Sequence, residues 1–390
     1  MHSILILVIV YFLLLNRKKQ LISGTNFFNI LSILYFGYGL FLMREGLDFY
    51  QYKKLSILSI IAVVAFNYSR INVFRKVQYK KIKENKLMLF TGCLVICFSL
   101  LLFFILVSKI GINNYFFKSR AVRIFYLKKM SYLNSFKPFF MIGLILLYQN
   151  YFSRKNKRLK KFLIFLNSLY LILALLENSR LDIMNIFIVN IYFFEKEKII
   201  KKKTIIILGI MLIFILLYYK SFMYSLKGYD IKIQRNFGEL TTWIKNYKKI
   251  DHSSIEFEFK GEAFKSMMKS FIIPLSGKND FSMTKWFMNK YYPQIFKEGG
   301  GRGFSGVLDA YMNAKYIGVF IYFYILGLFS YCFEKRRESC YFEIIYIFVI
   351  LNMMRIFRSE FQIFTKSMWW YTILPVLIIF IFNKFIKKII

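Results

Sequence analysis

Residues 87–109 read LMLFTGCLVICFSLLLFFILVSK, in which Lys109 is the only charged residue. A helix needs about 20 mostly apolar residues to cross the hydrocarbon core of a bilayer, so this stretch predicts a membrane-spanning helix. Similar stretches recur along the whole chain and predict an all-α polytopic integral membrane protein with about 11 transmembrane helices. The predicted spans are residues 2–15, 21–43, 50–69, 87–109, 132–152, 161–177, 181–194, 204–222, 310–333, 341–354 and 367–383.

The overall composition agrees with a membrane protein. Of the 390 residues, 57% are hydrophobic and 21% are aromatic, which leaves no separate soluble domain. A net charge of +37, from 57 Lys and Arg against 20 Asp and Glu, would also suit a nucleic-acid partner. However, the basic residues cluster between apolar segments, and no RNA-binding or zinc-finger motif accompanies them. We therefore expect these basic residues to interact with the lipid bilayer, and we expect no nucleic acid as a partner.

The basic clusters also predict the orientation of the chain. They lie at residues 17–19, 70–86, 154–161, 196–203, 335–337 and 384–388. Loops rich in Lys and Arg stay on the cytoplasmic side of a membrane. All six clusters fall on that side if the chain crosses the membrane eleven times with its amino terminus outside. This number of crossings agrees with the predicted count of about eleven spans.

The chain divides into three predicted parts. Residues 1–222 hold eight spans with short loops, residues 223–303 form one large extracytoplasmic loop, and residues 304–390 hold the last three spans with a polar helix. The large loop contains tryptophans, prolines and a glycine run, so we expect it to be folded. Within it, residues 264–273 and 281–292 show apolar residues at helical spacing among lysines, which predicts helices in the membrane interface. A solvated lid without chemistry is the alternative.

Arginines occur on the predicted outer face, where the positive-inside tendency disfavours them. They are Arg120, Arg123, Arg180, Arg302, Arg355 and Arg358. Guanidinium groups bind phosphate through two hydrogen bonds and stay charged in partly dry sites, so converging arginines suit an anionic ligand such as a lipid pyrophosphate. Alternatively, each arginine anchors its helix to lipid headgroups or pairs with a nearby carboxylate. In that case Arg180 would pair with Glu177 or Asp182, and Arg358 with Glu360.

A glycine run precedes the ninth predicted span, within residues 298–318, which read EGGGRGFSGVLDAYMNAKYIG. Gly301 and Gly303 allow backbone N–H groups to turn toward an anion at the start of a helix. The run is not a nucleotide-binding Walker loop, because no G-K-[ST] ending follows.

Polar residues follow the glycine run at the outer end of the same span, where unpaired polar atoms are costly. They are Ser305, Asp309, Tyr311 and Asn313. Asp309 and Asn313 lie one turn apart on one helix face. The Asp309 carboxylate could orient a sugar hydroxyl or take its proton; the alternative is an ion pair with Lys315 or an arginine that ends the helix.

This arrangement resembles the Wzy-type oligosaccharide repeat-unit polymerases of O-antigen and capsule assembly. The resemblance rests on G-x-G-x-S at 301–305, acid-A-Y-x-N at 309–313, Gly318 before a span, the long outer loop, and the arginine-rich turn at 354–360. Its more specific part covers residues 264–366. The family more often has Glu in place of Asp309, and an aromatic-Gly pair where Ala314 and Lys315 stand.

The resemblance implies a GT-C-like membrane glycosyltransferase that needs neither metal nor cofactor, in the cytoplasmic membrane of a bacterium. The active site would face the periplasm or the outside. The enzyme would transfer a growing glycan from undecaprenyl pyrophosphate to the non-reducing sugar of another undecaprenyl-pyrophosphate-linked repeat unit. A chain-length regulator and a flippase would be further partners. Arginines would stabilise the leaving pyrophosphate, and Asp309 or His252 would act as the base on the acceptor hydroxyl.

Two other functions fit parts of the pattern. An O-antigen ligase uses a similar lipid-linked donor with a different acceptor, and sequence separates it poorly from a polymerase. A lipid-linked oligosaccharide flippase or other transporter would need polar residues through the depth of its spans. No DxD motif or cluster of His, Cys and carboxylate residues occurs in a predicted outer loop, so we expect no metal site.

Overall fold

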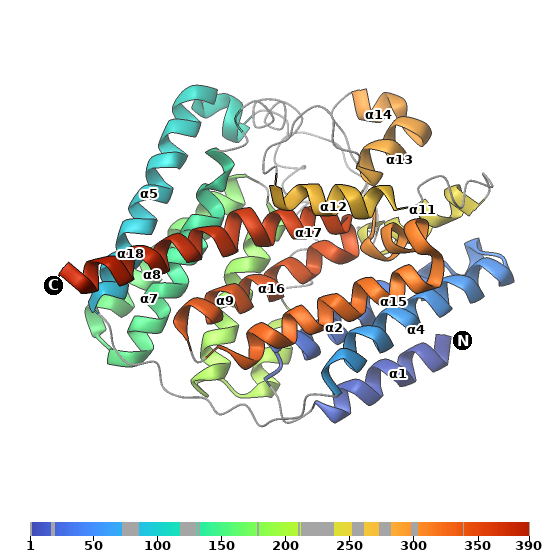
Figure 1. The fold of residues 1–390 in the computed structure, drawn as a ribbon, viewed down its shortest axis with the longest axis horizontal. Helices are drawn as coiled ribbons and strands as arrows, with labels where there is room; N and C mark the ends of the chain where they lie inside the picture. Colours follow the sequence, from blue (N-terminus) through green and yellow to red (C-terminus); the bar gives the residue numbers. More distant parts are fainter. Residues whose placement is uncertain are drawn as a thin grey trace. The chain divides into compact units, whose positions relative to one another are not determined.

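The computed structural model describes most of the chain. The described residues are 2–16, 20–71, 86–117, 130, 133–177, 179–209, 211, 238–251, 261–272, 282–297, 303–337 and 339–389. All regular secondary structure within these ranges is helical (Figure 1). Seven helices in the described part are long and apolar enough to cross a membrane. The chain is therefore a helical, multi-pass membrane protein, as predicted.

Each of the seven helices overlaps a predicted span. They are Gly24–Leu42, Phe49–Ser69, Lys86–Ile110, Lys157–Leu176, Gly306–Lys335, Cys340–Arg358 and Phe361–Ile386. Three other predicted spans form helices that are shorter or more polar: α1 (His2–Leu15), α7 (Phe136–Arg154) and α9 (Arg180–Lys196). Most of the remaining span, 204–222, lies outside the described residues. The count of eleven spans stays a prediction.

The chain forms two compact units. Unit 1 comprises Met1–Gln78, Phe237–Arg336 and Phe348–Trp370, and unit 2 comprises Tyr79–Asn236, Arg337–Ile347 and Tyr371–Ile390. Helix α16 (Cys340–Arg358) contributes its first turns to unit 2 and the rest to unit 1.

Unit 1 is built around two long helices from opposite ends of the sequence. Helix α4 (Phe49–Ile71) packs against α15 (Gly306–Lys335), as Figure 1 shows. Aromatic rings fill the space between these helices and their neighbours. The ring of Phe28, from α2 (Gly24–Ser32), stacks on Phe66 at 3.8 Å between centroids and lies 5.4 Å from the ring of Phe357 on α16. Such aromatic burial supplies much of the packing energy of a helical core.

The described part of the predicted outer loop contributes four helices to unit 1. They are α11 (Gly238–Asp251), α12 (Glu262–Ile272), α13 (Met283–Tyr291) and α14 (Pro293–Lys297). Helices α12 and α13 occupy the two segments that the sequence predicted as helical. Helix α11 is fixed by Trp243, whose side chain is buried and whose Nε1 donates to the carbonyl of Tyr35 at 3.0 Å. Helix α12 packs on α15 and on α17 (Phe361–Met368). The described parts of this segment are therefore helical and packed into unit 1.

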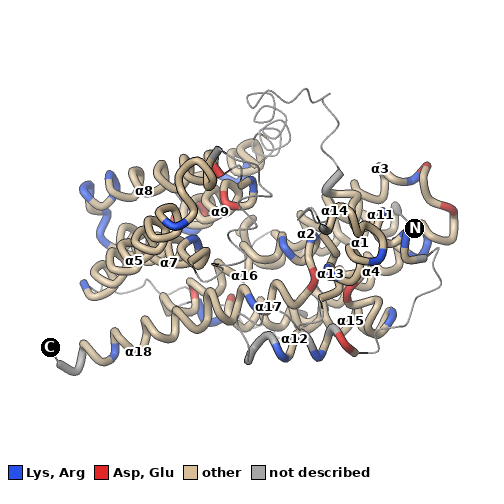
Figure 2. Tube along the Cα trace, turned by 90° about the horizontal axis from the view of Figure 1, so that it is seen from above, with Lys and Arg blue, Asp and Glu red and all other residues tan. Residues whose placement is uncertain are grey.

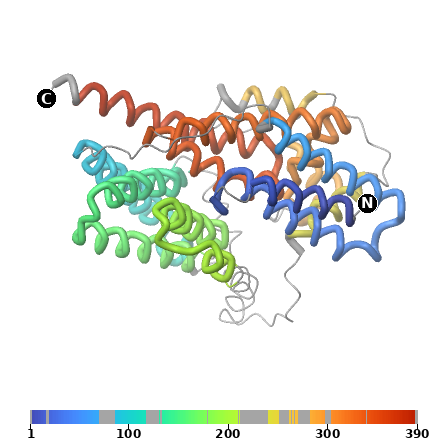
Figure 3. The backbone as a smooth tube through the Cα atoms, turned by 90° about the horizontal axis from the view of Figure 1, so that it is seen from below, coloured from blue at the N-terminus to red at the C-terminus, as the bar shows by residue number. Residues whose placement is uncertain are grey.

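Unit 2 is a group of helices that follow one another along the chain, coloured cyan to green in Figure 3. Helix α5 (Lys86–Ile110) packs along α7, which is followed by α8 (Lys157–Leu176) and α9. The approach of α5 and α7 requires a small residue, because a Cβ atom on Gly143 would lie 2.6 Å from the side chain of Ile96. Small residues allow this kind of close backbone contact between membrane helices. Helix α18 (Leu374–Ile389) also packs on α5.

Charged positions lie mostly near helix ends, with long uncharged stretches between them (Figure 2). At one end of unit 2, Lys137 forms ion pairs with Glu177 and Asp182. At the other end, the Lys196 Nζ lies 2.5 Å from Glu343 Oε1. Lys137 and Asp182 lie in the first turns of α7 and α9, whereas Lys196 lies in the last turn of α9.

Helix α15 carries a sharp internal break. Ala314 has φ −151° and ψ 33°, and Lys315 has φ 51° and ψ −140°, so neither residue is helical. The break separates a short polar helix, residues 306–313, from the apolar helix that follows. It falls where the resemblance to the polymerase family places an aromatic-Gly pair. Glycine is the residue for which such a positive φ is favourable.

Candidate functional site

The polar helix begins at Ser305, which was predicted as a ligand-binding residue. Ser305 has extended backbone angles, and its Oγ accepts a hydrogen bond from the backbone N–H of Val307 at 3.1 Å. This is the geometry of a helix N-cap, which satisfies one of the open N–H groups in the first turn. Ser305 is buried. It therefore defines where α15 starts.

Gly303 lies against the arginine-rich turn. A Cβ atom at Gly303 would be 2.0 Å from the carbonyl oxygen of Arg358, so any other residue would collide with the backbone. The Gly303 carbonyl accepts a hydrogen bond of 2.7 Å from Asn246 Nδ2 on α11. The end of the glycine run is thus held between α11 and the end of α16. Two segments that the sequence selected separately are in direct contact.

Asp309 joins the polar helix to α17. Its Oδ2 accepts a hydrogen bond of 2.9 Å from the backbone N–H of Phe361, the first residue of α17. Its Oδ1 accepts a longer one, 3.3 Å, from Asn313 Nδ2, which confirms the predicted sharing of a face. A carboxylate at a helix N-terminus satisfies an open N–H and interacts favourably with the helix dipole. Asp309 is 2% exposed, so it positions α17 from within the core of unit 1.

Glu360 makes a similar contact with the start of α13 (Met283–Tyr291). Its carboxylate accepts hydrogen bonds from the Ser282 hydroxyl at 2.6 Å and from the backbone N–H of Thr284 at 3.2 Å, at the start of α13. Burial raises the pKa of the Glu360 carboxyl above its usual range, although these hydrogen bonds and Lys366 oppose the shift. The sequence offered Glu360 only as a partner for Arg358. The structure instead places it between α17 and α13.

The two arginines of the turn lie half-buried near the end of α16. Arg355 is oriented from α17, because its Nη1 donates to the Ser367 hydroxyl at 3.1 Å. That hydroxyl in turn donates to Asn352 Oδ1 at 2.8 Å. A guanidinium held in this way loses less side-chain freedom when it binds an anion. Arg355 thus links α16 to α17, and the contacts of Gly303 and Asp309 join the start of α15 to the same two helices.

Tyr311 lies on another face of the same polar helix and contacts a buried lysine. The Lys54 Nζ, on α4, lies 5.2 Å from the centroid of the Tyr311 ring and 5.5 Å from that of Tyr247 on α11. Lys54 is only 6% exposed. Contacts at this distance are cation–π interactions. Sequence reasoning missed Lys54, although the two adjacent lysines, Lys53 and Lys54, in the first turns of an apolar helix were a signal.

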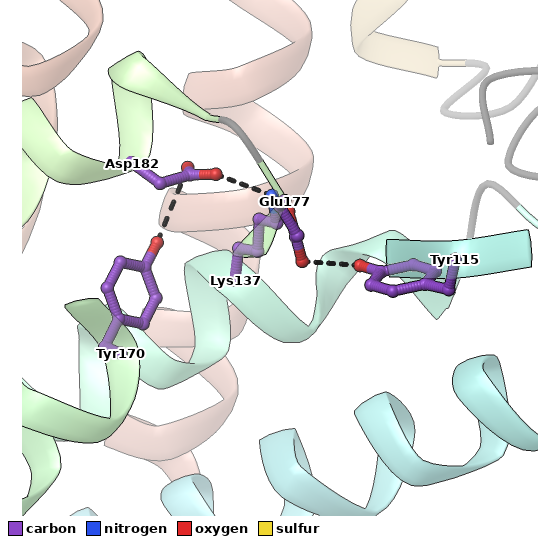
Figure 4. Close-up of polar contacts among 5 residues, drawn as sticks. All are labelled: Tyr115, Lys137, Tyr170, Glu177 and Asp182. Carbon is purple, nitrogen blue, oxygen red and sulfur yellow. Dashed lines mark hydrogen bonds and ion pairs between the residues drawn. The ribbon is translucent and has the colours of Figure 1, made fainter. Parts of the chain in front are cut away.

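A second charged cluster lies in unit 2, at the turn that carries Arg180 (Figure 4). Lys137 of α7 forms ion pairs with Glu177 and with Asp182, the latter at 2.6 Å. The hydroxyl of Tyr115 donates to Glu177 Oε1 at 2.5 Å, and that of Tyr170 to Asp182 Oδ1 at 3.5 Å. The sequence offered these two carboxylates as partners of Arg180, which begins α9. Both carboxylates have Lys137 as an ion-pair partner.

Several predicted site residues lie outside the described part of the chain: Arg120, Arg123, His252, Gly301 and Arg302. Arg180 belongs to unit 2, whereas Arg355 and Arg358 belong to unit 1. The convergence of all these arginines on one ligand stays a prediction. Within the described residues, no group of three or more His, Cys, Asp or Glu side chains could hold a metal ion.

Buried polar atoms without a hydrogen-bond partner among the described residues occur in both units, and several of those in unit 1 lie on α11, α13, α15 and α17. They include Asn246 Oδ1, Thr284 Oγ1, Tyr322 OH and Gln362 Nε2. Asn246 contacts Gly303 through its other amide atom, Thr284 contacts Glu360 through its backbone, and Gln362 follows Phe361 in α17. Such atoms are rare in folded proteins and often mark a place where a ligand or water binds.

Comparison with protein-family models, with curated proteins and with solved structures gives no match for this chain.

Proposed function

We propose that this protein polymerises undecaprenyl-pyrophosphate-linked oligosaccharide repeat units into a surface polysaccharide, either O-antigen or capsule. The observation that supports this most is the contact between Gly303 and the backbone of Arg358. It joins the glycine run and polar helix to the arginine-rich turn, and these are the features on which the resemblance to Wzy-type polymerases rests. The site lies at one end of the helix Gly306–Lys335, which can span a membrane. A lipid-linked substrate presents its pyrophosphate at such an end.

The arginines supply the anion-binding part of the proposed site. Arg355 and Arg358, with Arg302 of the glycine run, bind the pyrophosphate of the donor through bidentate hydrogen bonds. Their charge stabilises the leaving group as negative charge develops on it. The Ser367 hydroxyl holds Arg355 in place, since it accepts a hydrogen bond from Nη1 at 3.1 Å. Gly301 and Gly303 let the backbone approach the same anion.

The transfer needs a base and a sugar-binding group. The acceptor hydroxyl oxygen forms a bond to the anomeric carbon of the donor, and the bond from that carbon to the pyrophosphate oxygen breaks. The hydroxyl proton passes to Asp309 or to His252. The carboxylate of Asp309 accepts two hydrogen bonds in unit 1, and a carboxylate has about four acceptor positions, so it can still accept one from a sugar hydroxyl.

A transporter of lipid-linked oligosaccharides is the second candidate, because polar side chains also lie within the depth of unit 2. Asn190, near the middle of α9, donates to Asn167 Oδ1 at 2.8 Å and accepts a hydrogen bond from the Tyr148 hydroxyl. Polar residues inside a membrane helix bundle line transport pathways or join helices to one another. A ligase shares the proposed chemistry and differs in its acceptor.

Arginine variants test the proposed site. Arg355→Ala and Arg358→Ala should shorten the polymer while membrane abundance stays normal. Arg355→Lys and Arg358→Lys should restore only part of its length, since lysine keeps the charge but loses the two parallel hydrogen bonds. Arg158→Ala, at an exposed position at the start of α8, is the matched control and should leave polymer length unchanged. Full-length polymer in both alanine variants would refute the proposed pyrophosphate site.

A further inference from the structure

Tyr322 is a tyrosine of α15 that the sequence did not select. Its side chain is 9% exposed, and its ring packs edge-on against the ring of Phe361, with 4.7 Å between centroids. Its hydroxyl is buried and has no hydrogen-bond partner among the described residues. A buried hydroxyl without a partner destabilises a fold, and phenylalanine would fill the same space without that penalty. The stability of the fold alone therefore does not explain why position 322 is a tyrosine rather than a phenylalanine.

The break in α15 brings Tyr322 toward Asp309. In an unbroken helix, residues 13 positions apart would be separated by about 20 Å along the axis. Here both residues contact Phe361: Asp309 Oδ2 lies 2.9 Å from its backbone N, and the Tyr322 ring packs on its side chain. The folding back requires Gly318, because a Cβ atom there would lie 2.2 Å from the carbonyl oxygen of Ala310. Asp309 and Tyr322 thus both contact Phe361, one at its backbone N–H and the other at its ring.

The pair has the chemistry of a sugar-binding site rather than a phosphate-binding one. A carboxylate accepts hydrogen bonds, while a phenol donates one and accepts another. Neighbouring hydroxyls of a sugar ring can satisfy both groups. A phosphate next to Asp309 would instead be repelled, and Glu360 precedes Phe361 in the chain and adds a second carboxylate. The arginines at the end of α16 remain the groups suited to the anion.

We propose that Tyr322 binds a hydroxyl of the substrate sugar, together with Asp309, and so is a further substrate-binding residue of the site. This inference rests on the proposed function, because it names the sugar part of the same lipid-linked substrate. The substitution Tyr322→Phe removes only the hydroxyl and keeps the ring that packs on Phe361. It therefore separates a binding role from a structural one.

The test uses the purified full chain in detergent and two measurements for each protein. The first is the unfolding temperature without ligand, and the second is its shift on adding undecaprenyl-pyrophosphate-linked oligosaccharide extracted from cells that lack this gene. We expect Tyr322→Phe to unfold at the same or a higher temperature than the wild type but to bind the lipid about tenfold more weakly, as the loss of one hydrogen bond predicts. Tyr324→Phe, on the same helix and half-buried, is the matched control and should bind normally.

Three results contradict parts of this account in different ways. Equal lipid binding by Tyr322→Phe and the wild type would overturn the role of Tyr322 while leaving the proposed function intact. A lower unfolding temperature of Tyr322→Phe without ligand would show that its hydroxyl has a structural partner, and would also overturn that role. No shift with the wild-type protein would contradict the proposed function itself, and the role of Tyr322 with it.

Discussion

Replacing Asp309 with alanine removes the acceptor for the backbone N–H of Phe361, which now donates to Oδ2 at 2.9 Å. Both groups are buried, so the N–H would be left without a partner, at a cost of about 1–3 kcal/mol. The loss of a negative charge at the start of α17 adds about 0.3–1 kcal/mol. For a unit of this size the sum corresponds to a fall in unfolding temperature of about 3–15 °C. The tryptophan fluorescence of the purified protein, followed during heating, measures it.

Asp309→Asn separates this structural contribution from catalysis. The asparagine oxygen can still accept the Phe361 N–H, so we expect a smaller fall in unfolding temperature than with alanine. If Asp309 is the base, asparagine should still reduce polymerisation by about 10²–10⁴-fold. Asp48→Ala is the matched control, because the Asp48 Oδ1 accepts from the backbone N–H of Gln51 at 2.7 Å on an exposed helix end and should matter less. An alanine variant of Asp309 that unfolds at the wild-type temperature would refute the proposed link between α15 and α17.

Three further predictions concern the stability of the purified protein. Lys315→Gly should raise the unfolding temperature by a few degrees, because φ 51° and ψ −140° cost a non-glycine residue about 1–3 kcal/mol; Lys315→Ala should not, and a larger fall with glycine than with alanine would contradict this. Because the pKa of Glu360 is raised in the native protein, this side chain binds a proton more tightly there than in the unfolded chain. Its contribution to the stability of the fold is therefore present below about pH 4 and is lost as the pH rises through the native pKa. The difference in unfolding temperature between the wild type and Glu360→Gln should therefore decline with rising pH, and a difference that grows would contradict the shift. Lys137→Met should destabilise the protein by about 3–5 kcal/mol, because it removes the cation that forms ion pairs with the buried Glu177 and Asp182. The triple variant with Glu177→Gln and Asp182→Asn should recover most of that loss, and equal unfolding temperatures for the single and triple variants would refute the ion-pair account.

The helices of this protein could be predicted because their signal is local. An apolar run such as residues 87–109 must be helical in a bilayer, since only a helix satisfies its own backbone there. The structure gives α5 as Lys86–Ile110, within one residue of the prediction. Polar residues at the end of a span, such as Asp309, also stand out in sequence because burial makes them costly. The structure brings Gly303 against the backbone of Arg358, and their role in one binding site stays a prediction.

The partners of the charged residues could not be predicted, because they depend on packing between distant segments. Sequence reasoning paired Glu177 and Asp182 with Arg180, the nearest arginine along the chain. It did not identify Lys137, about 40 residues earlier, which α7 brings to both carboxylates. Asp309 likewise bonds a backbone group 52 residues away. Hydrophobic patterns show which face of a helix is buried, but they carry no information on which helix covers it.

The break in α15 also could not be predicted from the sequence. Breaks in helices usually coincide with proline or glycine, and here the residue with positive φ is Lys315. Without the break, Tyr322 would lie far from the polar helix, so no sequence pattern indicated that it belongs to the site. Buried hydroxyls of this kind become visible only once the packing around them is known.

The most direct test of the proposed function is a gel profile of lipid-linked and surface-linked glycan from the organism that makes this protein, with and without the gene. The proposed polymerase predicts that the ladder of long chains disappears while single repeat units remain. Long polymer that persists on undecaprenyl pyrophosphate and fails to reach its final acceptor would contradict that function and indicate a ligase. Repeat units that stay on the inner leaflet would contradict it in favour of a transporter.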